Sequence, residues 1–372
     1  MKKKILYSLK SPYREQLDVI GFRFGHGKKS AAIIGAMRGN EVQQMYVCSR
    51  MIQELKKLEA KGLIAEDHEI IVIPCVNYYS MNIGKRFWAM DNTDINRMFP
   101  GYWQGETTQR IADGVFSKIQ GYEYGIQLAS FYQQGNFLPH VKMMDTGFAS
   151  LELMKDFGLQ FGIIRKPRPY DTTTLNYNWQ VWETKAFSVY ANATDDIDEN
   201  AADEAVYAIL RFLDKQGIVS ANTPPGYITK IIDESKTKQI RSEASGIFKS
   251  LIEIGKRVER GDILGIISDP FEGEVLSEIR SPVSGTVYFE YFAPLINSNT
   301  VCFKIKKKKK NMSKKEFSQT KTVVSPDGKT ITTMTVSGSS ETTKNTSTVT
   351  TSFTASTTTT STTTVTITKS ED

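Results

Sequence analysis

The chain has 372 residues, of which 40% are hydrophobic and 24% are charged, and its formal net charge at pH 7 is +6. This composition predicts a globular protein, and the length predicts two or three domains. Seven lysines between residues 306 and 315 account for the positive charge, since the chain without them would carry −1. No aromatic residues alternate with these lysines, which favours a solvated linker, and no nucleic-acid partner is expected.

The cysteine content and the hydropathy of the chain indicate its compartment. Cys48, Cys75 and Cys302 have no CxxC spacing and are too few for a disulfide scaffold, so a cytoplasmic location is expected. The apolar run after the N-terminal lysines lasts about five residues, whereas a secretory signal needs roughly 7–15. No stretch approaches the roughly 20 apolar residues of a membrane span.

Residues 1–222 alternate short β-branched runs with helical patterns, and they predict an α/β domain with a mixed central sheet. Residues 30–37 and 68–77 predict buried strands, because each is a nearly continuous apolar run. Residues 41–62 and 199–217 predict helices, because their apolar residues recur at helical spacing. Helices are therefore expected to cover the sheet.

Residues 223–305 consist of short apolar runs separated by glycine and proline, which predicts a small all-β domain. Its two halves, 245–270 and 277–305, resemble each other, as in the barrel-sandwich domains related to biotinyl and lipoyl carriers. A carrier needs a lysine at the tip of its central hairpin. Residues 269–276 read DPFEGEVL and offer none, so a structural or substrate-covering role is expected.

Residues 306–372 form a lysine-run linker followed by a Thr/Ser-rich, low-complexity tail. The tail has few large apolar residues, so its composition predicts that it is largely disordered. Residues 321–336 are an exception, because Pro-Asp-Gly between two β-branched runs predicts a hairpin or a strand that pairs with another chain. Self-association through the tail therefore remains open.

A dense polar cluster lies in residues 86–101, which read RFWAMDNTDINRMFPG. One interpretation is an anion pocket, because arginines offer forked donors to a carboxylate and an asparagine adds amide hydrogen bonds. The other is an ion-paired loop whose charges neutralise one another. The cluster consists of Arg86, Asp91, Asp94, Asn96 and Arg97.

Four stretches in this order resemble the succinylglutamate desuccinylase/aspartoacylase family. They are a strand and turn ending in RGNE, then DINRMFPG, then a strand ending at a ligand position, then the small all-β domain. The resemblance covers roughly residues 20–305 and implies a zinc carboxypeptidase-like fold. Members of that family use a His-Glu-His zinc site and a glutamate base to cleave acyl-amide bonds of small N-acylated amino acids, or related amides and esters.

Most of the positions that the resemblance marks as catalytic are substituted in this chain. The family's HG[NDS]E motif reads RGNE, so Glu41 is kept while Arg38 replaces a histidine. Ala129 stands at the second histidine, and Tyr190 stands at the glutamate base. Catalytic zinc needs about three protein ligands, so no metal and no cofactor are expected, and zinc enters only if the site is rearranged. Arg38, three residues before Glu41, can neutralise that carboxylate itself.

Two residues outside these motifs offer alternatives. His140 follows the lost ligand position and could line the site or approach Glu41 with Asp145, although a lone histidine is more often a hydrogen-bonded structural residue. Glu183 lies in an aromatic-rich loop, residues 166–184, and could replace the missing base; packing against the β domain is an equal alternative for that loop.

Three functions remain open on the sequence. The first is a divergent deacylase relative without zinc hydrolysis that binds a small acidic ligand or acts as a scaffold. The second is an active amide or ester hydrolase with a rearranged site, and the third is a folded domain that presents its Thr/Ser-rich tail for modification or assembly. The predicted ligand-binding residues are Arg86, Asn96, Arg97 and His140.

Overall fold

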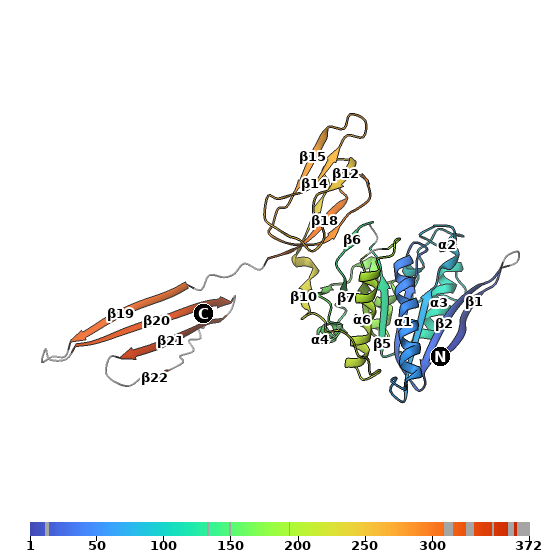
Figure 1. The fold of residues 1–372 in the computed structure, drawn as a ribbon, viewed down its shortest axis with the longest axis horizontal. Helices are drawn as coiled ribbons and strands as arrows, with labels where there is room; N and C mark the ends of the chain where they lie inside the picture. The colour runs from blue at the N-terminus through green and yellow to red at the C-terminus, as the bar shows by residue number, and fades with distance from the viewer. Residues whose placement is uncertain are drawn as a thin grey trace. The chain divides into compact units, whose positions relative to one another are not determined.

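We describe a computed structural model of the chain, which has two compact units, Met1–Lys308 and Lys309–Asp372 (Figure 1). The residues that the structure describes are 1–11, 15–131, 134–148, 150–192, 194–308, 315–324, 331–343, 346–355 and 361–362.

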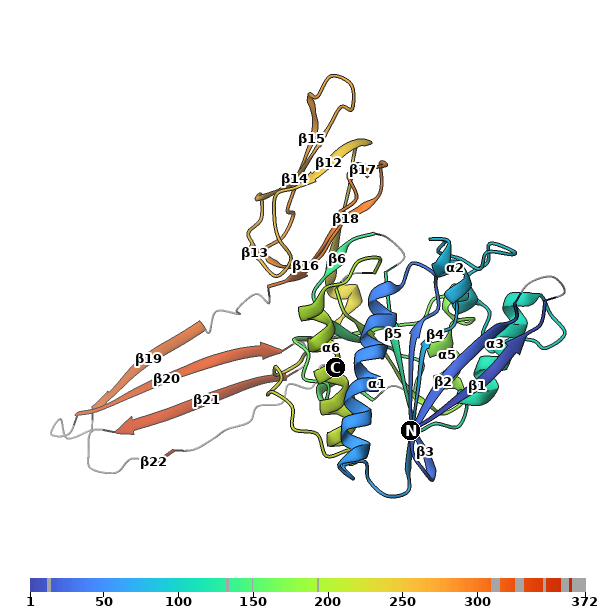
Figure 2. The same cartoon turned by 45° about the vertical axis from the view of Figure 1, so that its right-hand side comes forward.

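A nine-stranded mixed sheet forms the centre of the larger unit, in the order β1-β2-β4-β3-β5-β9-β7-β8-β10 (Figures 1 and 2). Strands β4, β3, β5 and β9 are parallel to one another, and β7 joins β9 in antiparallel orientation. The predicted α/β domain with a mixed sheet is therefore confirmed. The strands are β1 (Lys2–Leu9), β2 (Leu17–Gly25), β3 (Lys28–Ala36), β4 (His68–Cys75), β5 (Tyr124–Ala129), β7 (His140–Met144), β8 (Phe161–Arg165), β9 (Lys185–Tyr190) and β10 (Lys230–Asp233).

Helices cover both faces of this sheet, as the apolar character of its central strands requires. Along β3, Ala31 and Ile33 contribute to the core under α1 and α6, whereas Ala32 and Ile34 contribute to the core under α3 and α5. The alternation follows from the two-residue period of a strand buried on both faces. The helices are α1 (Val42–Ala60), α2 (Tyr78–Asn82), α3 (Thr107–Ile119), α4 (Leu151–Lys155), α5 (Leu175–Val181) and α6 (Glu199–Lys215), with short 3-10 turns η1 (Ile95–Arg97), η2 (Pro169–Asp171) and η3 (Glu234–Lys236).

The C-terminal part of the larger unit contains two small antiparallel sheets, in the orders β11-β18-β16-β13 and β15-β14-β12-β17. They enclose a separate apolar core that includes Phe248, Leu264 and Phe303. The predicted all-β architecture is confirmed, while the barrel-sandwich type remains a prediction. The strands are β11 (Thr237–Arg241), β12 (Gly246–Ser250), β13 (Arg257–Val258), β14 (Ile263–Ser268), β15 (Val275–Arg280), β16 (Gly285–Glu290), β17 (Leu295–Ile296) and β18 (Val301–Lys307).

A shared cluster joins this β part to the central sheet. The short strand β6 (Asn136–Phe137) leaves the α/β part and pairs with β16. Phe137 and Ile163 pack there with Tyr288, Phe289 and Val301. Large buried aromatic side chains stabilise such a contact through the apolar area they remove from water. The contact fixes β18 beside the carboxyl ends of the central strands.

The smaller unit has four antiparallel strands, in the order β19-β20-β21-β22. β19 pairs with β20 in antiparallel orientation, and the pairing nearest the turn joins Val324 to Ile331. This agrees with the hairpin predicted for residues 321–336, whose turn lies outside the described residues. Strands here differ from the disorder that the composition predicts. Threonine and valine favour extended backbone, and this preference competes with the lack of apolar burial on which that prediction depends. The strands are β19 (Lys315–Val324), β20 (Ile331–Thr343), β21 (Thr346–Ala355) and β22 (Ser361–Thr362).

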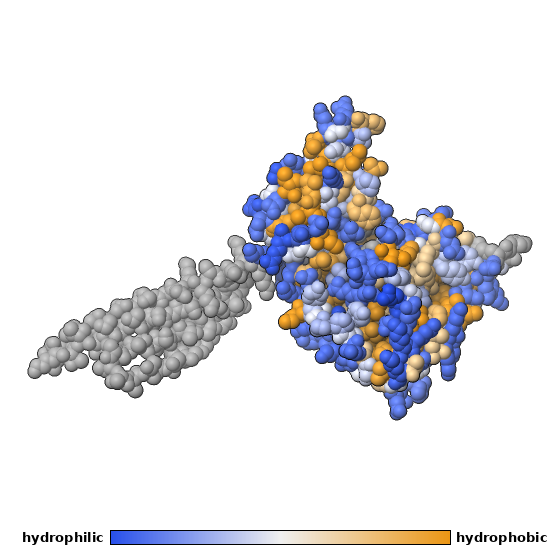
Figure 3. Space-filling view, viewed as in Figure 1, coloured by the Kyte–Doolittle hydropathy of each residue, from blue (hydrophilic) through white to orange (hydrophobic). Residues whose placement is uncertain are grey.

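The face of the molecule shown in Figure 3 has hydrophobic side chains gathered on the C-terminal β part. Exposed apolar residues there include Ile247, Leu251, Val275 and Leu295. No helix in the described part of the chain is both long and apolar enough to cross a membrane.

Candidate functional site

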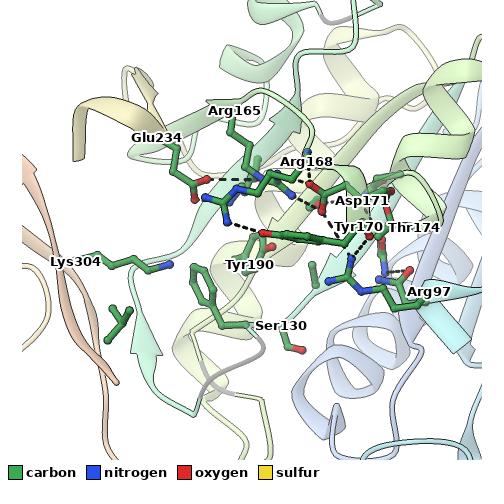
Figure 4. Close-up of a pocket in the computed structure, with 18 of the residues that line it drawn as sticks. Arg97, Ser130, Arg165, Arg168, Tyr170, Asp171, Thr174, Tyr190, Glu234 and Lys304 are labelled. Carbon is green, nitrogen blue, oxygen red and sulfur yellow. Dashed lines mark hydrogen bonds and ion pairs between the residues drawn. The ribbon is translucent and has the colours of Figure 1, made fainter. Parts of the chain in front are cut away.

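A cavity of about 370 Å³ opens at the carboxyl ends of β3, β5 and β9, and Arg165 of the antiparallel strand β8 also lines it (Figure 4). This is the edge at which open α/β sheets bind ligands, because the loops that follow adjacent parallel strands diverge there. The far wall comes from the C-terminal β part, through β11 and β18. The cavity is strongly cationic, since two acidic residues, Asp171 and Glu234, face seven basic ones. The basic residues are Arg38, Arg97, Lys142, Arg165, Arg168, Arg241 and Lys304.

Arg38 lies at one end of the cavity, clamped between two carboxylates. Its Nη1 donates to Glu41 Oε1 at 2.9 Å, and its Nε and Nη2 donate to Asp94 Oδ2 at 3.0 and 2.8 Å. Burial by itself would lower the pKa of Arg38, but the charges of Glu41 and Asp94 raise that pKa overall. The arginine is 7% exposed and remains a permanent cation, with each of its three nitrogens bonded to one of these two acids.

Glu41 has no oxygen left for a metal ion. Besides Arg38, its carboxylate accepts hydrogen bonds from the backbone N–H groups of Met37 and Arg38 at 2.8 and 3.0 Å, and from Ser130 Oγ at 2.5 Å. The predicted ion pair between Arg38 and Glu41 is therefore present. Within the described ranges, no three His, Cys, Asp or Glu side chains come together as a metal site. These residues do not fit the catalytic zinc that the family resemblance implies.

A chain of amide side chains forms the floor of the cavity. Asn96 Oδ1 accepts from Gln127 Nε2 at 3.3 Å and from the backbone N–H of Leu175 at 3.4 Å. Gln127 Oε1 in turn accepts from Asn176 Nδ2 at 3.0 Å, and Asn176 also donates to Ser188 Oγ. Because each amide fixes the next, the floor offers oriented polar groups that do not need to reorganise when a ligand binds.

Arg97 lies at the rim, with its side chain 34% exposed. Its Nη1 donates to the backbone oxygen of Tyr170 at 2.6 Å and lies 3.7 Å from Asp171 Oδ1. Among the described residues, these are its polar protein contacts, so part of its guanidinium fork faces the cavity. The polar cluster predicted around it separates into two roles, because Asp94 binds Arg38 and Asp91 accepts hydrogen bonds from the side chains of Thr107 and Thr108.

The two acids of the cavity are already paired. Arg165 donates to both oxygens of Asp171, at 2.6 and 2.8 Å, and Lys142 lies 2.6 Å from Glu234. Burial would raise the pKa of Asp171, yet the hydrogen bonds from Arg165 lower it overall, and Lys142 lowers the pKa of Glu234 against the same effect. Both acids thus remain ionised and neutralise their own partners.

The remaining basic residues of the lining are Arg168, Arg241 and Lys304, and Figure 4 shows Arg168 and Lys304. Arg168 donates to the hydroxyl of Tyr170, and Arg241 donates to the backbone oxygen of Asn299 at 2.6 Å. In the described part of the chain, none of these three side chains forms an ion pair with a carboxylate. Arg168 and Arg241 therefore give the cavity positive charge that a ligand anion can neutralise.

Tyr190 lies in the cavity, at the position that the resemblance gives to the base. Burial raises its pKa to about 12, so its hydroxyl is protonated at neutral pH. Its ring stacks on His140, with 4.6 Å between ring centroids. His140 is 1% exposed, its Nδ1 bonds to the Leu138 oxygen at 2.7 Å, and burial lowers its pKa to about 3. His140 is a neutral structural histidine behind Tyr190. Of the two alternatives that the sequence offers, the structure agrees with the structural one, and His140 is not among the residues that line the cavity.

Two further predicted site residues lie outside the cavity. Glu183 is exposed at the end of α5, so the structure does not place it as an alternative base. Arg86 donates to the backbone oxygen of Phe131 at 3.4 Å, and it is not among the residues that line the cavity. The aromatic-rich loop nevertheless lines the cavity through Arg168, Tyr170 and Asp171, as one of the two alternatives predicts.

Lys304 and Arg165 line the cavity but belong to none of the motifs and clusters described from the sequence. Each has a recognisable signal, because a single basic residue within or at the end of an apolar strand needs a reason to be buried. Lys304 lies in the run VCFKI, and Arg165 ends the run FGIIR. Which cavity they enter follows only from the tertiary fold.

The nine-stranded sheet, the cavity at its carboxyl edge and the appended β part define a carboxypeptidase-like α/β protein. The model of the succinylglutamate desuccinylase/aspartoacylase catalytic domain matches residues 27–215, just over half of the chain. The chain belongs to this family, as the resemblance indicates.

Solved structures with the same fold include a succinylglutamate desuccinylase from Silicibacter sp. TM1040, with 19% identity and a TM-score of 0.68 over 80% of this chain and 91% of that one. An aspartoacylase family protein from Mesorhizobium loti has 20% identity and a TM-score of 0.65, over 80% of this chain and 91% of that one. At sequence level, N-alpha-acetyl-L-2,4-diaminobutyric acid deacetylase from Halomonas elongata is 27% identical over 84 residues, which is 23% of each chain. The match thus spans about a quarter of that curated relative.

Proposed function

We propose that this protein binds a small acidic ligand of the N-acyl amino acid type without using zinc for hydrolysis. The observation that carries the proposal is the position of Arg38. Its guanidinium neutralises Glu41, the one metal-ligand position that the chain keeps, and both oxygens of that carboxylate also accept hydrogen bonds from other groups of the protein. A dication brought to the same place would meet a permanent positive charge.

The chemistry of the cavity supports an anionic ligand. Arg97 presents part of a planar fork at the rim, a geometry suited to a carboxylate, and Asn96 is held in place beside it. Arg168 and Arg241 add positive charge to the cavity. An N-acyl acidic amino acid has two carboxylates and an amide on its α-carbon, and the polar floor around Gln127 is suited to that amide.

The family supports an acylated amino acid in particular. The relative from Halomonas elongata acts, by its name, on an N-acetylated diamino acid. The cationic cavity of this chain favours a ligand with an acidic side chain over one with an amine, because a second amine would meet seven basic residues.

Calorimetric titration of the purified protein with N-acetyl-L-glutamate and N-acetyl-L-aspartate tests the proposal. The matched controls are the side-chain amides, N-acetyl-L-glutamine and N-acetyl-L-asparagine, which have the same shape and one negative charge fewer. Tighter binding of the acids than of the amides, with the ligand recovered intact, is expected. Absence of heat with all four ligands would contradict binding, and release of the free amino acid would contradict the lack of hydrolysis.

A further inference from the structure

Lys304 is a buried amine that the binding of an acyl amino acid does not explain. It lies on β18, is 9% exposed, and projects from the C-terminal β part into the cavity (Figure 4). Its Nζ lies 4.1 Å from the ring centroid of Phe131 and 5.3 Å from that of Phe289. Among the described residues, no carboxylate oxygen lies within ion-pairing distance of its Nζ. The charge of Glu234 favours the protonated form of Lys304, but Glu234 forms its ion pair with Lys142.

The surroundings of Lys304 disfavour its charged form. Burial is the largest effect, and the neighbouring charge of Lys142 adds to it, followed by the charges of Arg168 and Arg165. Glu234 opposes these effects and does not cancel them, so the pKa of Lys304 falls to about 7. At pH 7 such an amine is neutral roughly a thousand-fold more often than a lysine with a pKa near 10.5.

A neutral amine is a nucleophile, and lysines activated in this way form Schiff bases with carbonyl compounds. The cavity also holds the groups that would orient an acid next to the amine. Arg168 and Arg241 lie in the same cavity without a carboxylate partner among the described residues, and each can bind one. The combination selects a carbonyl compound that carries an acid group.

We infer that Lys304 is a covalent site that forms an imine with a 2-oxo acid, whose carboxylate is held by Arg168 and Arg241. The amine nitrogen attacks the carbonyl carbon and a C–N bond forms. The carbonyl oxygen then leaves as water with the two protons of the amine, and the C=N bond remains. No oxidant or reductant is needed, and hydrolysis by water returns the free lysine and the oxo acid.

Reductive trapping tests this site. The full-length protein is incubated with pyruvate and sodium cyanoborohydride, the intact mass is measured, and the modified residue is located by peptide mass spectrometry. We expect one adduct per chain, on Lys304, with at least ten-fold more labelling than any other lysine. The rate should rise with pH around a midpoint near 7, because the neutral amine is the reacting form.

Three variants and one control compound make the test more specific. Lys304→Arg keeps the charge and should abolish the adduct, whereas Lys249→Arg, an exposed lysine on β12, should not change it. Lys304→Met serves as a second loss of the amine if the arginine distorts the wall. Acetone, which has a carbonyl but no carboxylate, should label Lys304 several-fold less than pyruvate does.

The inference is overturned if pyruvate labels surface lysines as fast as Lys304, if Lys304→Arg is labelled equally, or if the midpoint lies near pH 10. Its failure is separable from that of the proposed function, since N-acetyl-L-glutamate binding is measured without pyruvate. Labelling without such binding would leave the imine site standing and remove the proposed ligand.

Discussion

The two ends of the cavity balance charge in opposite ways. At one end Arg38 is matched by Glu41 and Asp94, and each of its three nitrogens donates to one of these carboxylates. At the other end Arg168 and Arg241 have no ion pair of their own among the described residues. A site whose charges are matched internally stabilises the fold, whereas a site with unmatched charge recruits a ligand. The comparison separates the position that the family resemblance gives to the metal from the part of the cavity that we propose binds a ligand.

Restoring histidines at the matched end should produce the largest change. In the double variant Arg38→His with Ala129→His, two imidazoles join Glu41, whose carboxylate is still oriented by the backbone N–H of Met37. We expect zinc affinity to rise by roughly 1000-fold or more, measured by competition with a chromogenic chelator. Each single variant is the control, since one added imidazole leaves the ligand set incomplete. No gain in the double variant would mean that Ala129 does not face Glu41.

Removing the cation at the matched end should cost stability. Arg38→Met leaves Glu41 and Asp94 buried without their counter-ion, and such losses amount to about 3–5 kcal/mol in the free energy of unfolding. Urea denaturation measures it. The matched control is Arg50→Met, because Arg50 pairs with Asp203 at 2.7 Å with both side chains at least one-third exposed, and the expected cost is below about 1 kcal/mol. Equal costs for the two variants would show that Arg38 is not the structural counter-ion.

Variants at the rim should affect binding more than stability. Arg97→Ala removes a charge-assisted contact worth about 1.5–3 kcal/mol, so binding of N-acetyl-L-glutamate should weaken by roughly 10- to 150-fold in calorimetry. Arg97→Lys should recover only part of this affinity, because an ammonium group cannot form the two-pronged contact. Unchanged affinity in Arg97→Ala would place the ligand carboxylate elsewhere, for instance on Arg168.

The smallest effect is expected from the C-terminal unit. A chain that ends at Lys308 should keep the melting temperature of the full chain within about 1–2 °C, since Met1–Lys308 is a compact unit with its own cores. Sedimentation of the two forms tests the separate proposal that the tail mediates self-association, because exposed strand edges can pair between chains. Identical sedimentation would remove the tail as an assembly element.

The fold could be predicted from local patterns because its signals are short in sequence. The helices found as α1 and α6, and the strands β3 and β4, follow from apolar periodicity within each segment. The pair Arg38–Glu41 could be predicted for the same reason, since its members are three residues apart. The partnership of Arg38 with Asp94 spans 56 residues, and Lys304 comes from a different part of the unit. Contacts of that kind depend on how the strands are ordered, which no local pattern contains.

The candidates that do not reach the cavity show a related effect. Residue type and distance along the chain make Glu183 and His140 candidates, beside the structural alternatives that the sequence also allows. The direction of each side chain depends on details of local backbone, and those details put Glu183 in solvent and His140 behind Tyr190. Residue type alone therefore overestimates how many polar groups reach a cavity.

Zinc content tests the central claim, that an arginine occupies the place of the metal, most directly. The purified full-length protein is incubated with excess zinc, desalted, and analysed for metal per chain, with the double variant Arg38→His and Ala129→His as the positive control. The account predicts far less than one zinc per wild-type chain. About one zinc per wild-type chain that survives mild chelation would contradict it, because Glu41 would then bind a metal despite Arg38.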